Sequence, residues 1–180
     1  MFGFGRKKSE KKEQTKPFVP GEMQPGQLEE QLLVRNLDNE RNITTSYRVA
    51  PSPFLKSAEI LVISFSGVYE RGSAGHKDAM YILGKIHFAL YMTEAIGIII
   101  DLRELKYVWG NEMNSIIGCS FEMKFGDVFP AIIVGRDCHK AIASLGGKRH
   151  ATDEEHVFET FDEAWQYVKQ NIEQWYREEM

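Results

Sequence analysis

The sequence predicts an α/β fold built on a mixed, mostly parallel sheet of about five strands with four helices. Three apolar runs of strand length, EILVISF, AIGIII and FPAIIV, indicate strands that are buried on both faces. Segments with helical spacing separate these runs, and such alternation is typical of a largely parallel sheet. With 180 residues, of which 43% are hydrophobic, the chain is large enough to form a core without disulfides.

Three parts are predicted along the chain. Residues 1–26 are polar, rich in lysine and broken by three prolines, so we expect a disordered basic tail. Residues 27–46 form a lead-in segment, whose leucines fit a short amphipathic helix or an irregular connection. Residues 47–180 form the α/β domain.

The first two predicted strands lie on either side of a loop that contains prolines. Ser46–Ala50 (SYRVA) reads as a strand, and Pro51 and Pro53 then force a loop. The segment Glu59–Glu70 opens with a continuous apolar run, as expected of a buried strand. Gly67 interrupts it where a bulge or a close backbone contact would fit. We expect these two strands to pair antiparallel at one side of the sheet.

A glycine-containing loop, RGSAGHKD, leads into the first predicted helix. The apolar residues that follow have helical spacing, which indicates one buried face. The residues of that face are Ala79, Ile82, Leu83, Ile86, Ala89 and Leu90. AIGIIID then forms the second core strand, and the apolar run ends on a single carboxylate, Asp101.

The middle of the chain predicts two shorter helices around the third core strand, FPAIIVG. Asn111 is in a position to cap the first of these helices. The residues that mark it are Met113, Ile116, Ile117, Ser120 and Phe121. Cys138–Leu145 forms the next helix, which ends at Gly146-Gly147 in the manner of a C-cap.

A short strand, HVFE, and a long helix complete the predicted fold. TFDE opens the helix with a capping box, in which Thr160 is the N-cap and Glu163 is the third helical residue. The apolar stripe of this helix consists of Phe161, Ala164, Trp165, Val168, Ile172 and Trp175.

The amino-acid composition limits the classes of partner and the cellular compartments that we expect for the protein. A net charge of −4 and a pI of about 5.8 argue against general nucleic-acid binding. The N-terminus lacks the apolar region of a signal peptide, and no apolar run approaches the roughly 20 residues of a membrane helix. We therefore expect no stable membrane insertion. Cys119 and Cys138 both lie in segments that read as helical, and without a disulfide framework the cytoplasm is the predicted location.

The residue pattern predicts no catalytic residue, no metal and no cofactor. Cys138 and His139 are neighbours, but adjacent side chains on a helix point about 100° apart and do not face each other. The five histidines lack the spacing of metal ligands. Two other classes stay open. The stretch ERGSAGHKD is similar to the glycine-rich backbone of crotonase-like or Clp-protease-like hydrolases and lyases. A lipid or small-ligand-binding module is the other, because related folds host such roles.

The element order and three local motifs resemble the STAS domain, the family of sulfate transporters and anti-sigma-factor antagonists. Residues 65–69 (FSGVY) resemble the family's strand that ends in Ser/Thr-Gly before the first helix. Residues 98–108 (IIIDLRELKYV) resemble the hydrophobic strand with Asp-Leu and an aromatic–aliphatic pair before the signature loop. Residues 143–146 and 157–164 resemble the closing turn, strand and helix. The resemblance covers about residues 47–175.

This resemblance implies a bacterial, regulatory and non-catalytic protein-interaction module. Its partner would be a regulatory protein, such as a kinase-like anti-sigma factor, or a second copy of the chain. The working surface would surround the N-terminal end of the second helix. It would consist of Trp109, Gly110, Asn111, Glu112 and Asn114.

The chain departs from the family pattern at this surface. Anti-sigma-factor antagonists carry Asp-Ser-Ser/Thr-Gly there, and a kinase phosphorylates one of the hydroxyls to block binding. The matching residues here, 109–112, are WGNE and carry no hydroxyl. We therefore expect constitutive binding or a different switch. Glu112 is either a permanent negative charge or an ordinary partner of the helix dipole. Trp109 is either an exposed interface anchor or a core residue folded over the sheet edge.

Overall fold

A computed structural model of the chain describes residues 36–55, 57–118, 121–123, 126–145, 147–148 and 150–179. The predicted tail, residues 27–35 of the lead-in segment and Cys119 lie outside these residues. The strands are β1 (Ile43–Pro51), β2 (Glu59–Val68), β3 (Ala95–Lys106), β4 (Phe121–Met123), β5 (Gly126–Val134) and β6 (Val157–Phe158). The α-helices are α1 (His76–Met92), α2 (Asn114–Ile117), α3 (Arg136–Leu145) and α4 (Phe161–Glu179). Short 3-10 helices are η2 (Leu37–Glu40), η3 (Gly72–Gly75), η4 (Asn111–Met113) and η5 (Ala151–Asp153).

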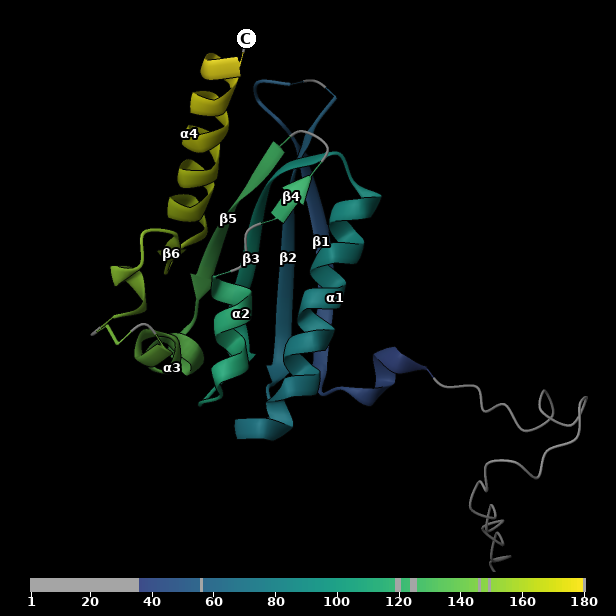
Figure 1. Ribbon diagram of the computed structural model, residues 1–180, viewed down its shortest axis with the longest axis vertical. Coiled ribbons are helices and arrows are strands. Elements are labelled where there is room, and N and C mark those ends of the chain that lie inside the picture. Colours follow the sequence, from purple (N-terminus) through teal and green to yellow (C-terminus); the bar gives the residue numbers. More distant parts are fainter. Residues whose placement is uncertain are drawn as a thin grey trace, which may run out of the picture. The chain divides into compact units, whose positions relative to one another are not determined.

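The described strands form one six-stranded mixed sheet (Figure 1). Its order is β1-β2-β3-β5, and β4 and β6 pair with different stretches of β5. β1 runs antiparallel to β2, whereas β2, β3, β5 and β6 are parallel to one another. The predicted class, a mostly parallel mixed sheet with four helices, is confirmed, as is the antiparallel pairing at its start. The short β4 is an additional strand.

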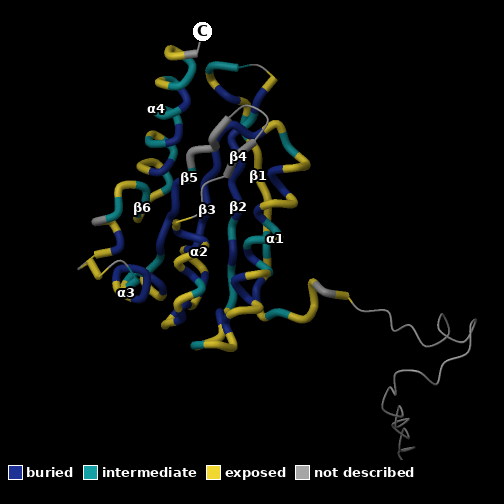
Figure 2. The backbone as a smooth tube through the Cα atoms, in the orientation of Figure 1, coloured by how far each residue is buried: buried dark blue, intermediate teal, exposed yellow. Residues whose placement is uncertain are grey.

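Two apolar clusters fill the two faces of the sheet, and β2 and β3 between them are largely buried (Figure 2). On one face, α1, α2 and α3 pack against residues that include Ile98 and Ile100. On the other face, α4 packs against residues that include Ile99 and Ile133. Successive strand residues point to opposite faces, so a continuous apolar run serves both clusters at once. None of the described helices has the length and apolar character needed to span a bilayer.

The structure corrects the predicted bounds in the middle of the chain. β3 does not end at Asp101 but continues to Lys106, because Leu102 and Leu105 remain buried and the strand stays paired with β2. The second helix is a single turn, and Phe121 belongs to β4 instead. Asn111 is not the N-cap. It is the first residue of η4, and Gly110, which precedes it, is the N-cap and has no side chain to accept a bond.

Several local predictions are confirmed. In the capping box, the Glu163 N–H donates to Thr160 Oγ1 at 3.3 Å, and the Thr160 N–H donates to Glu163 Oε2 at 3.2 Å. Gly67 has a φ of 119°, and a Cβ there would lie 2.0 Å from the Asn42 carbonyl oxygen, which is the predicted close backbone contact. Gly147, with a φ of 65°, follows the end of α3 as a C-cap glycine does.

Candidate functional site

The five predicted site residues lie together in one turn at the carboxyl end of β3. We call this turn, residues 108–114, the Trp109 corner. It leaves the sheet after Lys106, passes through η4 and enters α2. Carboxyl ends of parallel strands are where binding surfaces of open α/β sheets are usually built.

Trp109 is exposed at this corner. Its accessible fraction is 58%, and its neighbour Val108 is also exposed. Asn111 and Asn114 are exposed beside it, whereas Gly110 is buried. Of the two interpretations left open by the sequence, the structure therefore has the exposed tryptophan and not the core residue.

The backbone below the indole is held by specific hydrogen bonds. The Tyr107 hydroxyl donates to the Gly110 carbonyl oxygen at 2.6 Å, and the Gly72 N–H donates to the Trp109 carbonyl oxygen at 3.3 Å. Burial raises the pKa of Tyr107 to about 12, so its phenol keeps the proton that it donates. The corner is thereby tied both to the end of its own strand and to the loop before α1.

Close packing also supports the corner. Gly72 lies under the indole, and a Cβ at this position would approach Trp109 Cη2 to 2.7 Å. Tyr107 and Tyr69 meet edge to face with their ring centroids 5.2 Å apart. Met113 is fully buried and anchors the far side of the turn in the core. Trp109 is therefore an exposed side chain on a well-packed base.

Glu112 is half exposed and lies near a histidine. Its Oε2 lies 3.6 Å from Nδ1 of His76, the first residue of α1. This pairing links the corner to α1, and it gives Glu112 a local electrostatic role besides the two that the sequence suggested. Whether the carboxylate imitates a phosphate stays a prediction.

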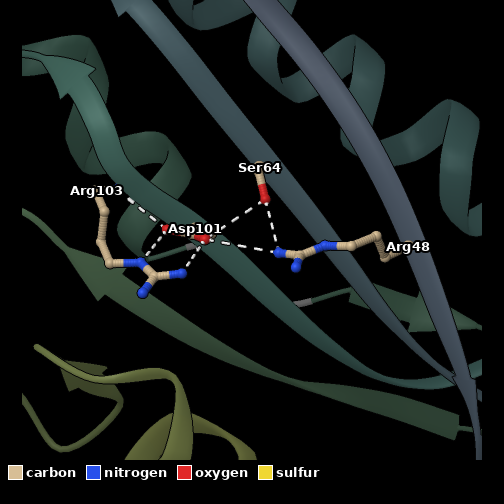
Figure 3. A network of polar contacts seen from close by, with 4 residues as sticks. All are labelled: Arg48, Ser64, Asp101 and Arg103. Carbon is tan, nitrogen blue, oxygen red and sulfur yellow. Dashed lines mark hydrogen bonds and ion pairs between the residues drawn. The ribbon is translucent and has the colours of Figure 1, made fainter.

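Asp101 lies inside β3 and joins a network with Arg103, Ser64 and Arg48 (Figure 3). Arg103 donates from Nε to Oδ1 at 2.9 Å and from Nη2 to Oδ2 at 2.7 Å. Ser64 Oγ lies 3.5 Å and Arg48 Nη2 lies 3.8 Å from Oδ2. Burial alone would raise the pKa of Asp101, but the hydrogen bonds from Arg103 and the charges of both arginines outweigh it and lower the pKa.

The network lies on the sheet face that carries α4, but beyond the apolar cluster of that helix. Ser64 and Asp101 continue the alternation of Val62 and Ile99, which are members of the cluster. The surface there is an open hollow of about 210 Å³. The hollow is lined by Thr44, Ser46, Ser64, Phe65, Ser66, Asp101 and Glu104.

Cys138 is a core thiol. It is 1% exposed, accepts a hydrogen bond from the Gly135 N–H at 3.3 Å, and packs in the cluster under α1 and α3. Burial raises its pKa to about 11, so at neutral pH it is a thiol and not the thiolate that a nucleophile needs. His139 lines a surface pocket instead, so the two side chains diverge as predicted.

Two further observations concern the alternative functions. Among the described residues, no group of three or more His, Cys, Asp or Glu side chains is placed to hold a metal ion. The pocket beside α1 and β1 has a volume of about 650 Å³ and is lined mainly by polar side chains, so it does not favour an apolar ligand. These polar residues include Asp38, Arg41, Thr45, Tyr81 and Lys85.

Comparison of the chain with models of protein families, with curated proteins and with solved structures gave no match. The geometry of the site is therefore the basis for a functional assignment. Sequence reasoning missed Gly72 and Tyr107, which support Trp109. The sequence carried one relevant signal, a glycine just before the first helix, but it did not indicate which side chain that glycine would contact.

Proposed function

We propose that the chain is a non-catalytic protein-interaction module, similar in role to the anti-sigma-factor antagonists of the STAS family. The Trp109 corner would dock a regulatory protein. One observation carries the proposal: an indole that is more than half exposed lies on a base fixed by Tyr107, Gly110 and Gly72. An apolar ring that is mostly exposed contributes little to the stability of the fold that carries it.

The physical argument concerns the cost of binding. A tryptophan buries a large apolar area when a partner covers it, and it is among the residues that most often dominate interface energetics. Association is opposed by the ordering of loops and side chains. At this corner the backbone hydrogen bonds already exist in the free protein, so less order has to be created on docking. Asn111 and Asn114 lie around the indole as a polar rim.

Binding at this corner would be constitutive with respect to the family's switch. Phosphorylation acts by adding nearly two negative charges to an interface. Residues 109–112 have no acceptor hydroxyl. The Glu112 carboxyl group would be present in every state, with His76 beside it.

The test is an affinity purification with three baits: the wild-type chain, Trp109→Ala and Tyr91→Ala. Tyr91 is the matched control because it is an exposed aromatic residue at the other end of α1, with an accessible fraction of 82%. Partners recovered with the wild type are then purified, and their affinities for the three chains are measured. Sedimentation of each chain alone tests association between copies.

We expect a regulatory protein, or a second copy, to bind the wild type and Tyr91→Ala equally and Trp109→Ala at least about tenfold more weakly. The proposal is wrong if the bound partner is retained equally by all three chains. It is also wrong if the wild type recovers no specific partner and sediments as a monomer at all concentrations.

A further inference from the structure

A cationic pocket lies next to α3, and the proposed docking function makes no use of it. It has a volume of about 490 Å³ and opens between the ends of β3 and β5, the start of α3 and the residue after β6. Its lining consists of Arg103, Val134, Gly135, Arg136, His139, Lys140 and Glu159. Three permanent cations and one imidazole therefore surround the pocket together with one carboxylate.

The cations are only partly neutralised by the protein itself. Lys140 forms no ion pair with any described residue. Arg136 Nε lies 3.5 Å from Asp137 Oδ1, but the arginine side chain is 96% exposed. Ion pairs this exposed contribute little to stability. Arg103 directs Nε and Nη2 to Asp101, which leaves other N–H donors of its guanidinium for a ligand. The chain as a whole has a net charge of −4, so the positive charge of this pocket is opposite in sign to the net charge of the chain.

The lining also includes one carboxylate, which lies beside the imidazole of His139. Glu159 Oε1 lies 3.3 Å from His139 Nε2, and the glutamate side chain is 63% exposed. It is therefore free to turn outward at small cost. The contact is not a hydrogen bond: His139 Nε2 is a buried atom without a hydrogen-bond partner among the described residues, and a ligand in the pocket can supply one.

We propose that this pocket binds a ligand carrying a phosphate monoester. The arginine and lysine side chains that line this pocket suit a tetrahedral dianion better than they suit a single carboxylate, because the oxygens of the dianion accept several charge-assisted hydrogen bonds at once. The donors here come from β3 (Arg103) and from α3 (Arg136, His139, Lys140). The volume admits a group larger than phosphate alone, so part of the attached molecule also fits. This assignment is independent of the Trp109 corner.

The test is a titration of the isotope-labelled full chain with three probes: inorganic phosphate, O-phosphoserine and adenosine monophosphate, followed by amide resonances. We expect saturable shifts that include His139 and Lys140. The double variant Arg136→Ala/Lys140→Ala should weaken binding about tenfold or more. Glu159→Gln should strengthen it, because the competing internal anion is removed. The matched control is Lys77→Ala, an exposed lysine on α1, and should bind as the wild type does.

The three probes separate the sources of phosphate. Equal affinity for all three would assign the pocket to the phosphate group itself, whereas tighter binding of one ester would identify the class of ligand. The proposal is overturned if none of the probes gives saturable shifts. It is also overturned if the double variant and Lys77→Ala reduce the affinity equally, or if Glu159→Gln weakens binding.

Discussion

The two faces of the sheet carry different kinds of side chain along the second half of β3. On one face, α1, α2 and α3 cover an apolar cluster that extends from Ala95 to Leu105 along β3. On the other face, the cluster under α4 includes Ile96 and Ile99, and the strand then presents Asp101. On this second face, α4 packs over one half, whereas the other half carries ion pairs and hydroxyl groups.

This difference shows how one strand can serve two kinds of surface. Up to Ile100, every side chain of β3 is buried and apolar, because helices pack against both faces of the sheet along this half of the strand. After Asp101, only the face under α1 still needs apolar residues, and Leu102 and Leu105 supply them. The opposite face is free for charge, provided that each buried charge is paired. Predictions follow from the two halves of that face.

The largest effect is expected in the half that α4 covers. A Cβ at Gly97 would lie 2.4 Å from Val168 Cγ1, and Val168 is fully buried. Gly97→Val should therefore push α4 away from β3 and lower the free energy of unfolding by about 3 kcal/mol. Urea denaturation measures the loss.

Gly84→Ala is the control for this substitution. Gly84 lies within α1, and a Cβ there has no atom within 4 Å. This variant should be more stable than the wild type by about 0.5–1 kcal/mol, because alanine favours a helix. Wild-type stability for Gly97→Val would mean that α4 does not lie as closely on β3 as described.

The next effect concerns the half that carries the ionic network. Asp101→Asn removes the charge that strengthens the two side-chain hydrogen bonds and the backbone hydrogen bond from Arg103, and should cost about 2 kcal/mol at neutral pH. Glu104→Gln, at an exposed position of the same strand, should stay within about 0.5 kcal/mol of the wild type. Similar losses in both variants would show that the network is no more than surface charge.

The wild type and Asp101→Asn should also differ in how their unfolding free energy depends on pH in acid. Because the pKa of Asp101 is lower in the folded chain than in the unfolded chain, its stabilisation is fully present above the unfolded value of about 3.9. The stabilisation is lost as pH falls through the lower, folded value. Below about pH 4, the wild type should lose stability more steeply than Asp101→Asn. Parallel curves of unfolding free energy against pH would contradict the lowered pKa.

The covered half of the sheet is also the part that the sequence predicts best. Continuous apolar runs indicate buried strands whatever lies beside them, so β2, β5 and the first half of β3 are evident. Beyond Asp101, charged residues interrupt the run and hide a strand whose apolar residues serve one face only. Phe121 has helical spacing with Ile117, but it belongs to β4 and pairs with Val128 of β5. Five residues of periodicity are too few to separate these outcomes.

The position of the candidate site could be predicted from the sequence, but the residues that support Trp109 could not. The end of a core strand followed by WGNE marks a turn at the carboxyl edge of the sheet, where the structure has it. The exposure of Trp109 depends on Gly72, which is distant in sequence, and on the hydroxyl of Tyr107. Such long-range contacts leave no periodic signal. The cationic pocket likewise combines the segment 134–140 with Arg103 and Glu159, which are distant from it in sequence.

The smallest effect on stability is expected at the Trp109 corner, where binding should change most. Trp109 contributes little to the core because most of its surface is exposed. Trp109→Ala should therefore lower the free energy of unfolding by about 1 kcal/mol or less, as surface substitutions usually do. Thermal and urea unfolding of this variant beside Tyr91→Ala would measure the difference.

The most direct test of the account is the affinity of Trp109→Ala for the partner of the wild-type chain, measured on a preparation whose unfolding free energy is also known. We predict an affinity at least about tenfold weaker, with stability nearly that of the wild type. Unchanged affinity in the correctly folded variant would contradict the claim that this corner is the docking surface.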